Sequence, residues 1–455
     1  MAAITRRELL GGAAAAAAFA IVPRHVLARS GQLAPSDKLN MGCIGVGGMM
    51  GPGDVNGVSG QNIYALCDVD ERQAGRTFVQ YPSAKLYRDF RRMLDKEAKN
   101  LNAVTVTIPD HNHALAALWA MERGLGVYCQ KPLTQTVWEA RLLTKAQQKY
   151  KVATQMGNQG LSSAETRLAI EAIWRGDIGD VTEVHSMNGG GFAREIMAWP
   201  APAPIPEGLV WDLWQGRAME HTYGEGILPA QWRGFLEYGS MMIGDWGIHQ
   251  LGPANWALGL HKTYPTSVTC TALEGVNPVT YPHYKCIIEF PERDHPNNPG
   301  QKMPPVKIYW YEGNFARNMT PPAGLTAEEI RGFNAICIGT KGVMGTSGHG
   351  NSVSMIPASK NEGYVNPPEV LKRVEGANHY QNWIDAVKGG DPPCSNFSIS
   401  APYTEWMLLG AISWRFPNEK LLWDGKNLRF TNNNKANEYI KPYMRKGWEL
   451  KDITV

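Results

Sequence analysis

The first part of the chain alternates short apolar runs with longer stretches of helical spacing. Apolar, β-branched runs occur at residues 39–46, 63–67, 103–108, 126–129 and 151–156. Apolar residues recur at helical spacing between these runs, as at residues 114–123 and 137–150. Strands that alternate with helices predict βαβ units and a parallel sheet covered on both faces. We expect this pattern to end near Asn158.

The pattern changes after an amphipathic stretch at residues 162–176. Strand-like runs, separated by long Gly-, Pro- and Trp-rich connections, then occur at residues 181–187, 266–273, 284–290, 306–311 and 335–339. The scarcity of helical pattern between them favours an open, mainly antiparallel sheet. Residues 378–416 are helical in pattern and long enough to pack on it. The predicted fold is α/β: a linker at residues 29–38, one domain over 39–160 and a second over 161–455.

Composition restricts the class of protein. The 455 residues are 43% hydrophobic, which suffices for two or three domains with buried cores. The net charge of +3 is too small for a nucleic-acid-binding surface. No long apolar run occurs beyond the N-terminus, which argues against an integral membrane protein. The seven cysteines include no CxxC, so we expect buried free thiols rather than a disulfide or a cysteine-ligated metal.

Residues 1–28 are typical of an export signal. Arg6 and Arg7 precede an Ala-rich apolar stretch at residues 11–22, and residues 26–28 form a small-residue cleavage site. Twin arginines indicate the Tat route, which carries folded proteins across the bacterial inner membrane. We therefore expect the Tat export machinery as a partner and a periplasmic or otherwise exported protein. A mitochondrial presequence or a disordered tail is the alternative.

The first predicted strand runs directly into a glycine-rich loop, Gly45-Val46-Gly47-Gly48-Met49-Met50-Gly51. Small residues there let the backbone approach a pyrophosphate at the N-terminus of the next helix. The next strand ends at Asp68, where a carboxylate can hydrogen-bond a ribose 2′-hydroxyl. No basic residue follows it directly, which favours NAD over NADP. The usual third glycine is Met50 here, with Gly51 one place late, and an ordinary glycine-rich loop is the alternative.

Three further segments carry a family resemblance. They are Thr107-Ile108-Pro109-Asp110-His111-Asn112-His113, then Gln130-Lys131-Pro132, and finally Gly244-Asp245-Trp246-Gly247-Ile248-His249. Together they resemble the Gfo/Idh/MocA oxidoreductases, whose pattern is a TPxxxH-type loop, EKP and D-x-x-x-H. Gln130 stands where that family usually has Glu. The resemblance covers residues 40–256 and continues more loosely toward residue 387.

The resemblance implies an N-terminal Rossmann domain, a C-terminal α/β domain with an open sheet, and an active site between them. Members mostly oxidise or reduce sugars and cyclitols, and a smaller group uses the same cofactor to hydrolyse glycosides. An exposed sheet face, common in the family, implies a homodimer or homotetramer. The residues expected to face the cofactor, besides the glycine loop and Asp68, are Ile108, Pro109, His113, Gln130, Lys131 and Asn158.

Oxidation of a secondary alcohol requires a base for the hydroxyl proton while hydride leaves to C4 of the nicotinamide. The candidates are Lys131, Asp245 and His249. The i, i+4 spacing of Asp245 and His249 places both on one face of a helix. We assign His249 as the general base or its proton relay, Asp245 as its orienting group or a hydroxyl ligand, and Lys131 as the group that holds the substrate oxygen. The first two roles can be exchanged, and a helix-capping Asp with a core His is the alternative.

Two other groups of residues leave alternatives open. Asp110, His111 and His113 could suggest a metal, but no third ligand of suitable spacing is evident, so we expect no metal. Aromatic residues cluster before Asp245, and rings of this kind can stack on sugar faces. Core packing is the favoured role for most of them. The tentative substrate contacts are Trp232, Arg233 and Tyr238.

Three functions remain open at this stage. The first is an exported NAD-dependent oxidoreductase acting on a sugar, cyclitol or glycoside. The second is a glycosidase that oxidises C3 transiently, eliminates the aglycone, adds water and reduces the ketone again. The third is a carbohydrate-binding relative without catalysis, against which the intact Lys131, Asp245 and His249 weigh. Free nicotinamide cofactor is scarce outside the cytoplasm, so we expect a tightly bound NAD.

Overall fold

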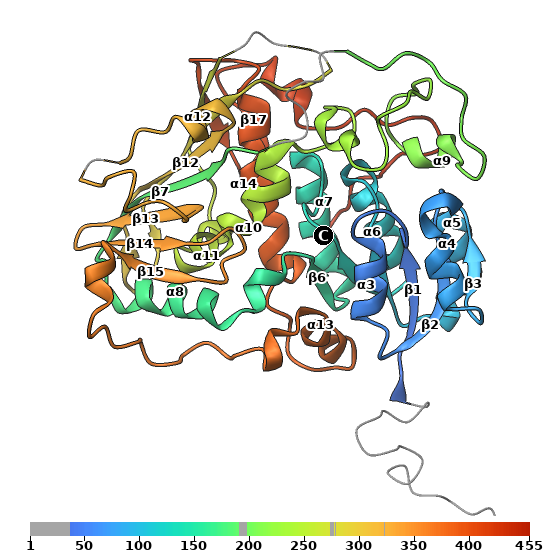
Figure 1. The fold of residues 1–455 in the computed structure, drawn as a ribbon, viewed down its shortest axis with the longest axis horizontal. Coiled ribbons are helices and arrows are strands. Elements are labelled where there is room, and N and C mark those ends of the chain that lie inside the picture. Colours follow the sequence, from blue (N-terminus) through green and yellow to red (C-terminus); the bar gives the residue numbers. More distant parts are fainter. Residues whose placement is uncertain (1–36, 191–197, 274–276, 278, 323) are drawn as a thin grey trace, which may run out of the picture.

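The computed structural model describes residues 37–190, 198–273, 277, 279–322 and 324–455. The predicted export signal, residues 1–28, and most of the predicted linker lie outside these ranges. Two sheets, one in each half of the chain, account for most of the strands (Figure 1). No helix among the described residues is both long enough and apolar enough to cross a membrane.

The first sheet is parallel throughout, with strand order β3-β2-β1-β4-β5-β6. Its strands are β1 (Asn40–Ile44), β2 (Asn62–Cys67), β3 (Lys85–Tyr87), β4 (Ala103–Val106), β5 (Gly126–Cys129) and β6 (Thr154–Met156). The β4 and β5 strands are buried on both faces, which explains their continuous apolar runs. The parallel sheet is therefore confirmed.

Five helices connect these strands: α3 (Gly51–Gly57), α4 (Glu71–Gln80), α5 (Phe90–Glu97), α6 (His113–Met121) and α7 (Val137–Tyr150). The limits of α7 agree with the sequence pattern because Thr136 and Glu139 cap its first turn reciprocally. Two predictions need correction. The short β3 strand was missed because its residues are mostly exposed, and β6 begins later than expected because Lys151 adopts a left-handed conformation that ends α7.

The second sheet has nine strands in the order β15-β14-β13-β7-β12-β9-β8-β16-β17. Their bounds are β7 (Val181–Asn188), β8 (Ser267–Ala272), β9 (Tyr284–Phe290), β12 (Val306–Glu312), β13 (Ala335–Gly339), β14 (Val343–Thr346), β15 (Val353–Ile356), β16 (Lys420–Asp424) and β17 (Arg429–Phe430). Only the β7–β12 pair is parallel. A separate two-stranded ribbon joins β10 (Arg293–Asp294) to β11 (Lys302–Met303). The α/β fold class with a mainly antiparallel second sheet is confirmed.

The second half of the chain contributes further helices. They are α8 (Ala164–Arg175), α9 (Trp211–Gln215), α10 (Ile248–Gln250), α11 (Gly252–Ala257), α12 (Asn314–Arg317), α13 (His379–Val387) and α14 (Phe397–Ser413). In Figure 1, α14 lies between the second sheet and α7. One hydrophobic core includes Val127 of the first sheet, Leu408 of α14 and Ile308 of the second sheet. The core is continuous across the predicted boundary at residue 160, which stays a prediction.

Residues 198–240, here called the cover segment, cross back over the first domain (Figure 1). Backbone hydrogen bonds join Val210 to Val69 and Glu71 to Gly208, next to the carboxyl end of β2. Aromatic and aliphatic side chains give the segment a core of its own: Leu209, Trp211, Trp214, Ala218, Tyr223, Ile227, Trp232, Phe235 and Tyr238. The second half of the chain therefore supplies a wall above the glycine-rich loop.

Candidate active site

The glycine-rich loop after β1 requires small residues at three positions. A Cβ at Gly45 would lie 2.2 Å from the Thr107 carbonyl oxygen, and one at Gly47 would lie 2.7 Å from Gln73. A Cβ at Gly51 would lie 2.6 Å from the backbone of Val46, so Gly51 provides the close helix–strand packing expected one place earlier. The shifted glycine therefore leaves the packing of α3 intact.

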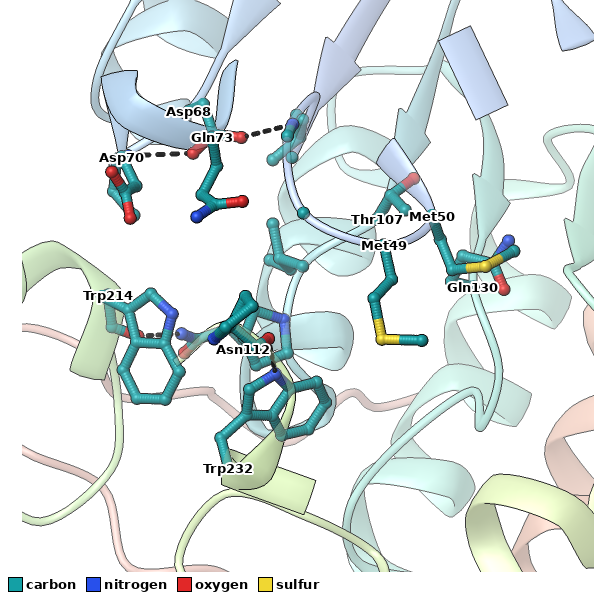
Figure 2. A pocket seen from close by; sticks show the side chains of 18 of the residues that line it. Met49, Met50, Asp68, Asp70, Gln73, Thr107, Asn112, Gln130, Trp214 and Trp232 are labelled. Atoms are coloured by element: carbon teal, nitrogen blue, oxygen red, sulfur yellow. Dashed lines mark hydrogen bonds between the residues drawn. The ribbon is translucent and has the colours of Figure 1, made fainter. Parts of the chain in front are cut away.

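The other side of the loop faces open space. Gly48 has φ +64° and nothing within 4 Å of its Cβ position. The backbone N–H groups of Gly48, Met49 and Met50 donate to no described residue. Such amides at the start of a helix can bind phosphate oxygens. Figure 2 shows Met49 extending from the loop toward the cavity, with Trp214 and Trp232 across from it.

Asp68 lies at the end of β2 and binds the loop directly. One carboxylate oxygen accepts the N–H groups of Val46 and Gly47, both at 2.8 Å, and the other accepts that of Asp70 at 2.9 Å (Figure 2). Burial raises the pKa of Asp68, and these three donors partly offset that effect. Asp68 therefore shapes the loop and also lines the cavity. Its contact with a ribose stays a prediction.

A cavity with about 1080 Å³ of empty space, counted out to the solvent, lies between the loop and the cover segment. Of the residues predicted to face the cofactor or substrate, those lining it are Gly45, Gly47, Gly48, Met49, Met50, Asp68, Ile108, Pro109, His113, Gln130, Lys131, Trp232 and Arg233. The cover segment adds Leu213, Trp214, Leu228 and Pro229. Asn158, Asp245, His249 and Tyr238 are not among the lining residues.

Lys131 and Asp245 form a buried ion pair at one end of this cavity. The Lys131 ammonium lies 2.7 Å from Asp245 Oδ1 and 3.0 Å from the Asp245 carbonyl oxygen. Arg233 Nε lies 3.5 Å from the same Oδ1. Burial alone would raise the pKa of Asp245, but the charges of Lys131 and Arg233 outweigh it and lower that pKa. Asp245 is therefore an ionised carboxylate that orients two cations.

Asp245 was expected to orient His249, and the structure pairs it with Lys131 instead. Residues Ile243–Gly247 form a π-helical turn that leads into α10, so Asp245 and His249 do not lie on one regular α-helix. No hydrogen bond joins them; Asp245 is paired with Lys131 instead. A π-helical turn widens the helix and is frequent at functional sites. Tertiary contacts across 114 residues of sequence determine this pairing, so spacing alone could not predict it.

His249 lies close enough to Lys131 for the two to interact electrostatically. Burial lowers the pKa of His249 well below its usual value, and the positive charge of Lys131 lowers it further. The ring is 6% exposed, and its buried Nδ1 has no hydrogen-bond partner among the described residues. A neutral imidazole beside an ammonium can accept a proton from a substrate hydroxyl.

Asn158, directly after β6, is buried with both side-chain amide atoms lacking a hydrogen-bond partner among the described residues. Unpaired buried amides are rare and indicate a missing ligand or water. His113, by contrast, is fully engaged: Nδ1 lies 2.7 Å from the Pro132 carbonyl oxygen and Nε2 lies 2.6 Å from that of Ile108. His113 thereby holds the two loops that flank the cavity end.

The aromatic residues of the cover segment fall into two groups. Trp232 lines the cavity, and the Arg233 guanidinium lies over its ring at 4.3 Å from the centroid. Tyr238 is fully buried against the rings of His111 and Trp214. Core packing therefore describes Tyr238, and the structure gives it no access to a substrate.

His111 also has a packing role, because His111 Nε2 and Asn112 Nδ2 both lie within hydrogen-bond distance of the Trp214 carbonyl oxygen. Among the residues with described coordinates, no group of three or more potential metal ligands converges. The seven cysteines are all buried free thiols.

Two further residues have chemistry near the site, of which only His349 was not singled out from the sequence. Asp110 lines the cavity, and burial raises its pKa to about 7 against the opposing charge of Arg233. His349, from the β14–β15 connection, has its ring centroid 4.5 Å from that of His249. Asp110 was considered from the sequence only with the two histidines of its loop, whereas His349 has no flanking signal beyond two glycines.

The residues present fit a dinucleotide. The glycine loop leaves no room for side chains on its packed side, and its unpaired amides lie at the start of α3, where the loop lines the cavity. An adenine ribose would lie near Asp68 and a nicotinamide near Lys131. The residues that line the cavity therefore offer the donors that NAD requires.

Two segments of the chain match models of known protein families. Residues 39–158 match the Gfo/Idh/MocA family described as "Oxidoreductase family, NAD-binding Rossmann fold". Residues 195–285 match the companion family described as "Oxidoreductase family, C-terminal alpha/beta domain". The first domain is therefore an NAD-binding Rossmann domain.

Individual relatives are more distant. Inositol 2-dehydrogenase of Salmonella typhimurium is 27% identical over 181 residues, 38% of this chain and 52% of the relative. D-apiose dehydrogenase of Paraburkholderia graminis is 33% identical over 89 residues, 20% of this chain and 23% of the relative. The chain thus spans about half the length, or less, of these curated relatives.

Solved structures agree in fold over most of the chain. An inositol dehydrogenase homolog complexed with NAD+ from Azotobacter vinelandii has a TM-score of 0.56 at 16% identity, covering 85% of this chain and 97% of that one. An oxidoreductase domain protein from Kribbella flavida has a TM-score of 0.55 at 18% identity, covering 85% and 99%. At such identities the likeness shows the fold alone.

Proposed function

We propose a function from the premise that this chain carries the two domains of the Gfo/Idh/MocA oxidoreductase family. The protein is an NAD-dependent oxidoreductase that transfers hydride between nicotinamide and the carbon of a secondary alcohol in a sugar, cyclitol or glycoside. One observation carries the proposal: the Lys131 ammonium, paired with Asp245, lines the dinucleotide cavity, and the buried His249 imidazole lies within reach of its charge. The names of the relatives, inositol 2-dehydrogenase and D-apiose dehydrogenase, support this substrate class.

Each of the three residues has a distinct role. NAD, when bound, supplies the hydride acceptor for alcohol oxidation. Asp245 orients Lys131, and the Lys131 ammonium donates a hydrogen bond to the substrate oxygen, which stabilises alkoxide character. His249, neutral because it is buried next to Lys131, accepts the hydroxyl proton. The ketone forms as proton and hydride leave in opposite directions.

The test is a substrate panel for the purified full chain with added NAD. Myo-inositol, other cyclitols, aldoses and glycosides are offered, and the absorbance of NADH is followed. Reduction of NAD with at least one secondary alcohol, lost in Lys131→Met and in His249→Ala, is the expected result. If the chain binds NAD but reduces it with none of these compounds, the oxidoreductase proposal fails and the carbohydrate-binding alternative remains.

The cover segment supports tight retention of the cofactor. Trp214, Trp232 and Pro229 wall the cavity opposite the glycine loop, and backbone hydrogen bonds fasten the segment to the end of β2. A ligand enclosed in this way dissociates slowly because the wall must open first. NAD released by denaturing the purified protein should be stoichiometric with the chain. Recovery of NAD-free protein from gentle purification would contradict retention.

Retention also keeps the glycosidase alternative open, because a redox-neutral cycle needs no exchange of NAD. Aryl glycosides incubated without added NAD distinguish the two functions. Release of the aglycone under these conditions indicates transient oxidation and elimination. Its absence, together with net NADH formation from a free sugar or cyclitol, indicates the dehydrogenase.

Export by the Tat route is also part of the proposal, supported by Arg6 and Arg7 before the apolar stretch at residues 11–22. Fractionation of a bacterial host expressing the full chain should find the processed protein in the periplasm. Replacing both arginines with lysine should retain it in the cytoplasm. Equal periplasmic amounts of both forms would overturn this part.

A second copy of the chain is the proposed partner of the exposed face of the nine-stranded sheet. Ile287, Tyr309 and Tyr311 lie half-buried there, and the His185 ring stacks on Tyr309 at 4.3 Å between centroids. Half-exposed aromatic and aliphatic residues on a regular sheet face are typical of an oligomer interface. Light scattering should give the mass of a dimer or tetramer, and Tyr309→Glu should shift it toward the monomer.

A further inference from the structure

The candidate base of the proposed reaction has no evident route for its proton. Oxidising an alcohol to a ketone releases one hydride, transferred to NAD, and one proton, which must reach the solvent. His249 is 6% exposed, and its buried ring atom Nδ1 has no hydrogen-bond partner among the described residues. A buried imidazole that takes a proton in each turnover must pass it on before the next turnover.

His349 is an exposed imidazole that touches His249. The two ring centroids lie 4.5 Å apart with an angle of 61° between the planes, so the edge of one ring faces the other. Trp246 packs beside both rings, with its centroid 5.3 Å from that of His349 and 6.1 Å from that of His249. His349 thus lies between the buried ring and the solvent.

The connection that carries His349 is fixed by contacts with the first turn of α8. The carbonyl oxygen of Gly350 accepts hydrogen bonds from Ser163 Oγ at 3.3 Å and Thr166 Oγ1 at 2.9 Å. The His349 carbonyl oxygen lies so close to Gly160 that a Cβ there would be 1.6 Å away. These contacts hold His349 against His249 although its own side chain is exposed.

The charges around the two rings favour outward proton transfer. The groups that act electrostatically on His249 are Lys131, His349 and His379. Burial and Lys131 make a protonated His249 unfavourable, and His349, which is less buried, also titrates below its usual pKa because of burial and Lys131. A proton is therefore not held by either ring and leaves through the exposed one.

We propose that His349 is a proton-relay residue, which transfers the proton taken up by His249 to the solvent. In oxidation, the substrate O–H bond breaks, its proton binds His249, and a proton passes from there, directly or through one water, to His349 and then to buffer. In reduction the same path runs in reverse. This inference rests on the proposed function for its physiological meaning.

The first test is chemical rescue in the full chain. His349→Ala should lower kcat about 10- to 100-fold in dilute buffer, with a small effect on KM and on NAD binding. Added imidazole, which can occupy the vacated space, should restore much of the loss. His261→Ala is the control, because His261 is a half-buried histidine whose ring bonds the Asn255 backbone away from the cavity. That variant should show no dependence on imidazole.

A second variant displaces the relay without removing it. Gly160→Ala forces the His349 carbonyl away and should produce the same buffer dependence as His349→Ala. If His349→Ala turns over like the wild type in dilute buffer, or loses activity that imidazole does not restore, the relay is wrong. The wild type in the same assay tests the proposed function separately, because inactivity of the wild type contradicts that function and says nothing of the relay.

A measurement without turnover completes the test. In protein labelled with ¹⁵N-histidine, the ring N–H of His249 exchanges with water at a rate that NMR can measure. His349→Ala should slow this exchange several-fold and imidazole should restore it. Unchanged exchange would overturn the relay whether or not a substrate has been found.

Discussion

Gln130 donates its side-chain amide to both carboxylate oxygens of the buried Asp54, each at 2.9 Å. Asp54 also accepts hydrogen bonds from Thr107 Oγ1 at 2.6 Å and from the Tyr380 hydroxyl at 2.7 Å. Burial raises the pKa of Asp54, and these donors partly offset the rise. The Oε1 atom of Gln130 accepts the backbone N–H of Lys131 at 3.2 Å. A buried carboxylate on α3 thus reaches the active-site lysine through one amide.

This arrangement explains why Gln stands where the family usually has Glu. In Gln130→Glu a second carboxyl group would replace the amide that donates to Asp54. The two carboxyl groups could not both be ionised without electrostatic repulsion. We expect the free energy of unfolding at pH 7 to fall by about 2–4 kcal/mol, measured by chemical denaturation. NAD affinity should fall as well, because Gln130 lines the cavity.

The exchanged pair is the matched control for that variant. Asp54→Asn combined with Gln130→Glu restores one amide and one carboxylate in contact, and should recover more than half of the lost stability. A single Gln130→Glu variant that is as stable as the wild type would show that the Asp54–Gln130 contact does not hold this part of the site.

Lys131→Met should separate cofactor binding from turnover. Removing the ammonium that binds the substrate oxygen should lower kcat/KM about 10²- to 10⁴-fold. NAD affinity, measured by calorimetry, should change much less, because the glycine loop and Asp68 are the predicted contacts of the other half of the dinucleotide. Lys131→Arg is the control that keeps the charge next to Asp245. Loss of NAD binding equal to the loss of activity would assign Lys131 a cofactor-binding role instead.

Local sequence signals predicted the first domain well. The strands β4 and β5 are buried on both faces and form continuous apolar runs, and α7 begins at Val137 because Thr136 and Glu139 cap it. The glycine loop and Lys131 were found for the same reason, since their chemistry depends on neighbours in sequence. Residues of this kind can be predicted from a single amino-acid sequence.

The rest of the site depends on contacts between distant segments. Asp245 was found, but its partner Lys131 is 114 residues away, and the π-helical turn that presents it has no simple periodicity. His349 reaches His249 from a loop 100 residues later, and no local pattern marks it. Core packing was the favoured role for most aromatic residues of the cover segment, and they do form a core. The sequence did not show that Trp214 and Trp232 also wall the dinucleotide cavity. Only the packing of two domains reveals these relationships.

Trp232 should control cofactor retention. Its ring is 5% exposed, lines the cavity and lies under the Arg233 guanidinium, so Trp232→Ala opens the wall above the glycine loop. We expect NAD to dissociate about 10- to 100-fold faster, measured by stopped-flow displacement. Trp423→Ala is the control, since Trp423 is 6% exposed on β16 and does not line the cavity. Equal dissociation rates in the two variants would show that the wall does not limit release.

Asp110 should make stability depend on pH near neutrality. It is 3% exposed, and its Oδ2 accepts hydrogen bonds from Ser240 Oγ at 2.6 Å and Ser240 N at 3.2 Å. Burial raises its pKa to about 7, whereas an unfolded Asp titrates near pH 4 (roughly 3.9). The folded state therefore binds the proton more tightly. The stability that this carboxyl contributes is complete below about pH 4 and is lost as pH rises through about 7.

Asp110→Asn removes this titration while keeping an oxygen that can accept from Ser240. The unfolding free energy of the variant relative to the wild type should therefore increase from about pH 4 to about pH 8, by an amount on the order of 4 kcal/mol at most. Urea denaturation of both proteins across this range measures the difference, in which titrations common to both cancel. Since the Arg233 charge opposes the raised pKa, Arg233→Met should move the transition to higher pH. A difference between Asp110→Asn and wild type that stays constant with pH would mean that Asp110 is already ionised in the folded protein at acidic pH.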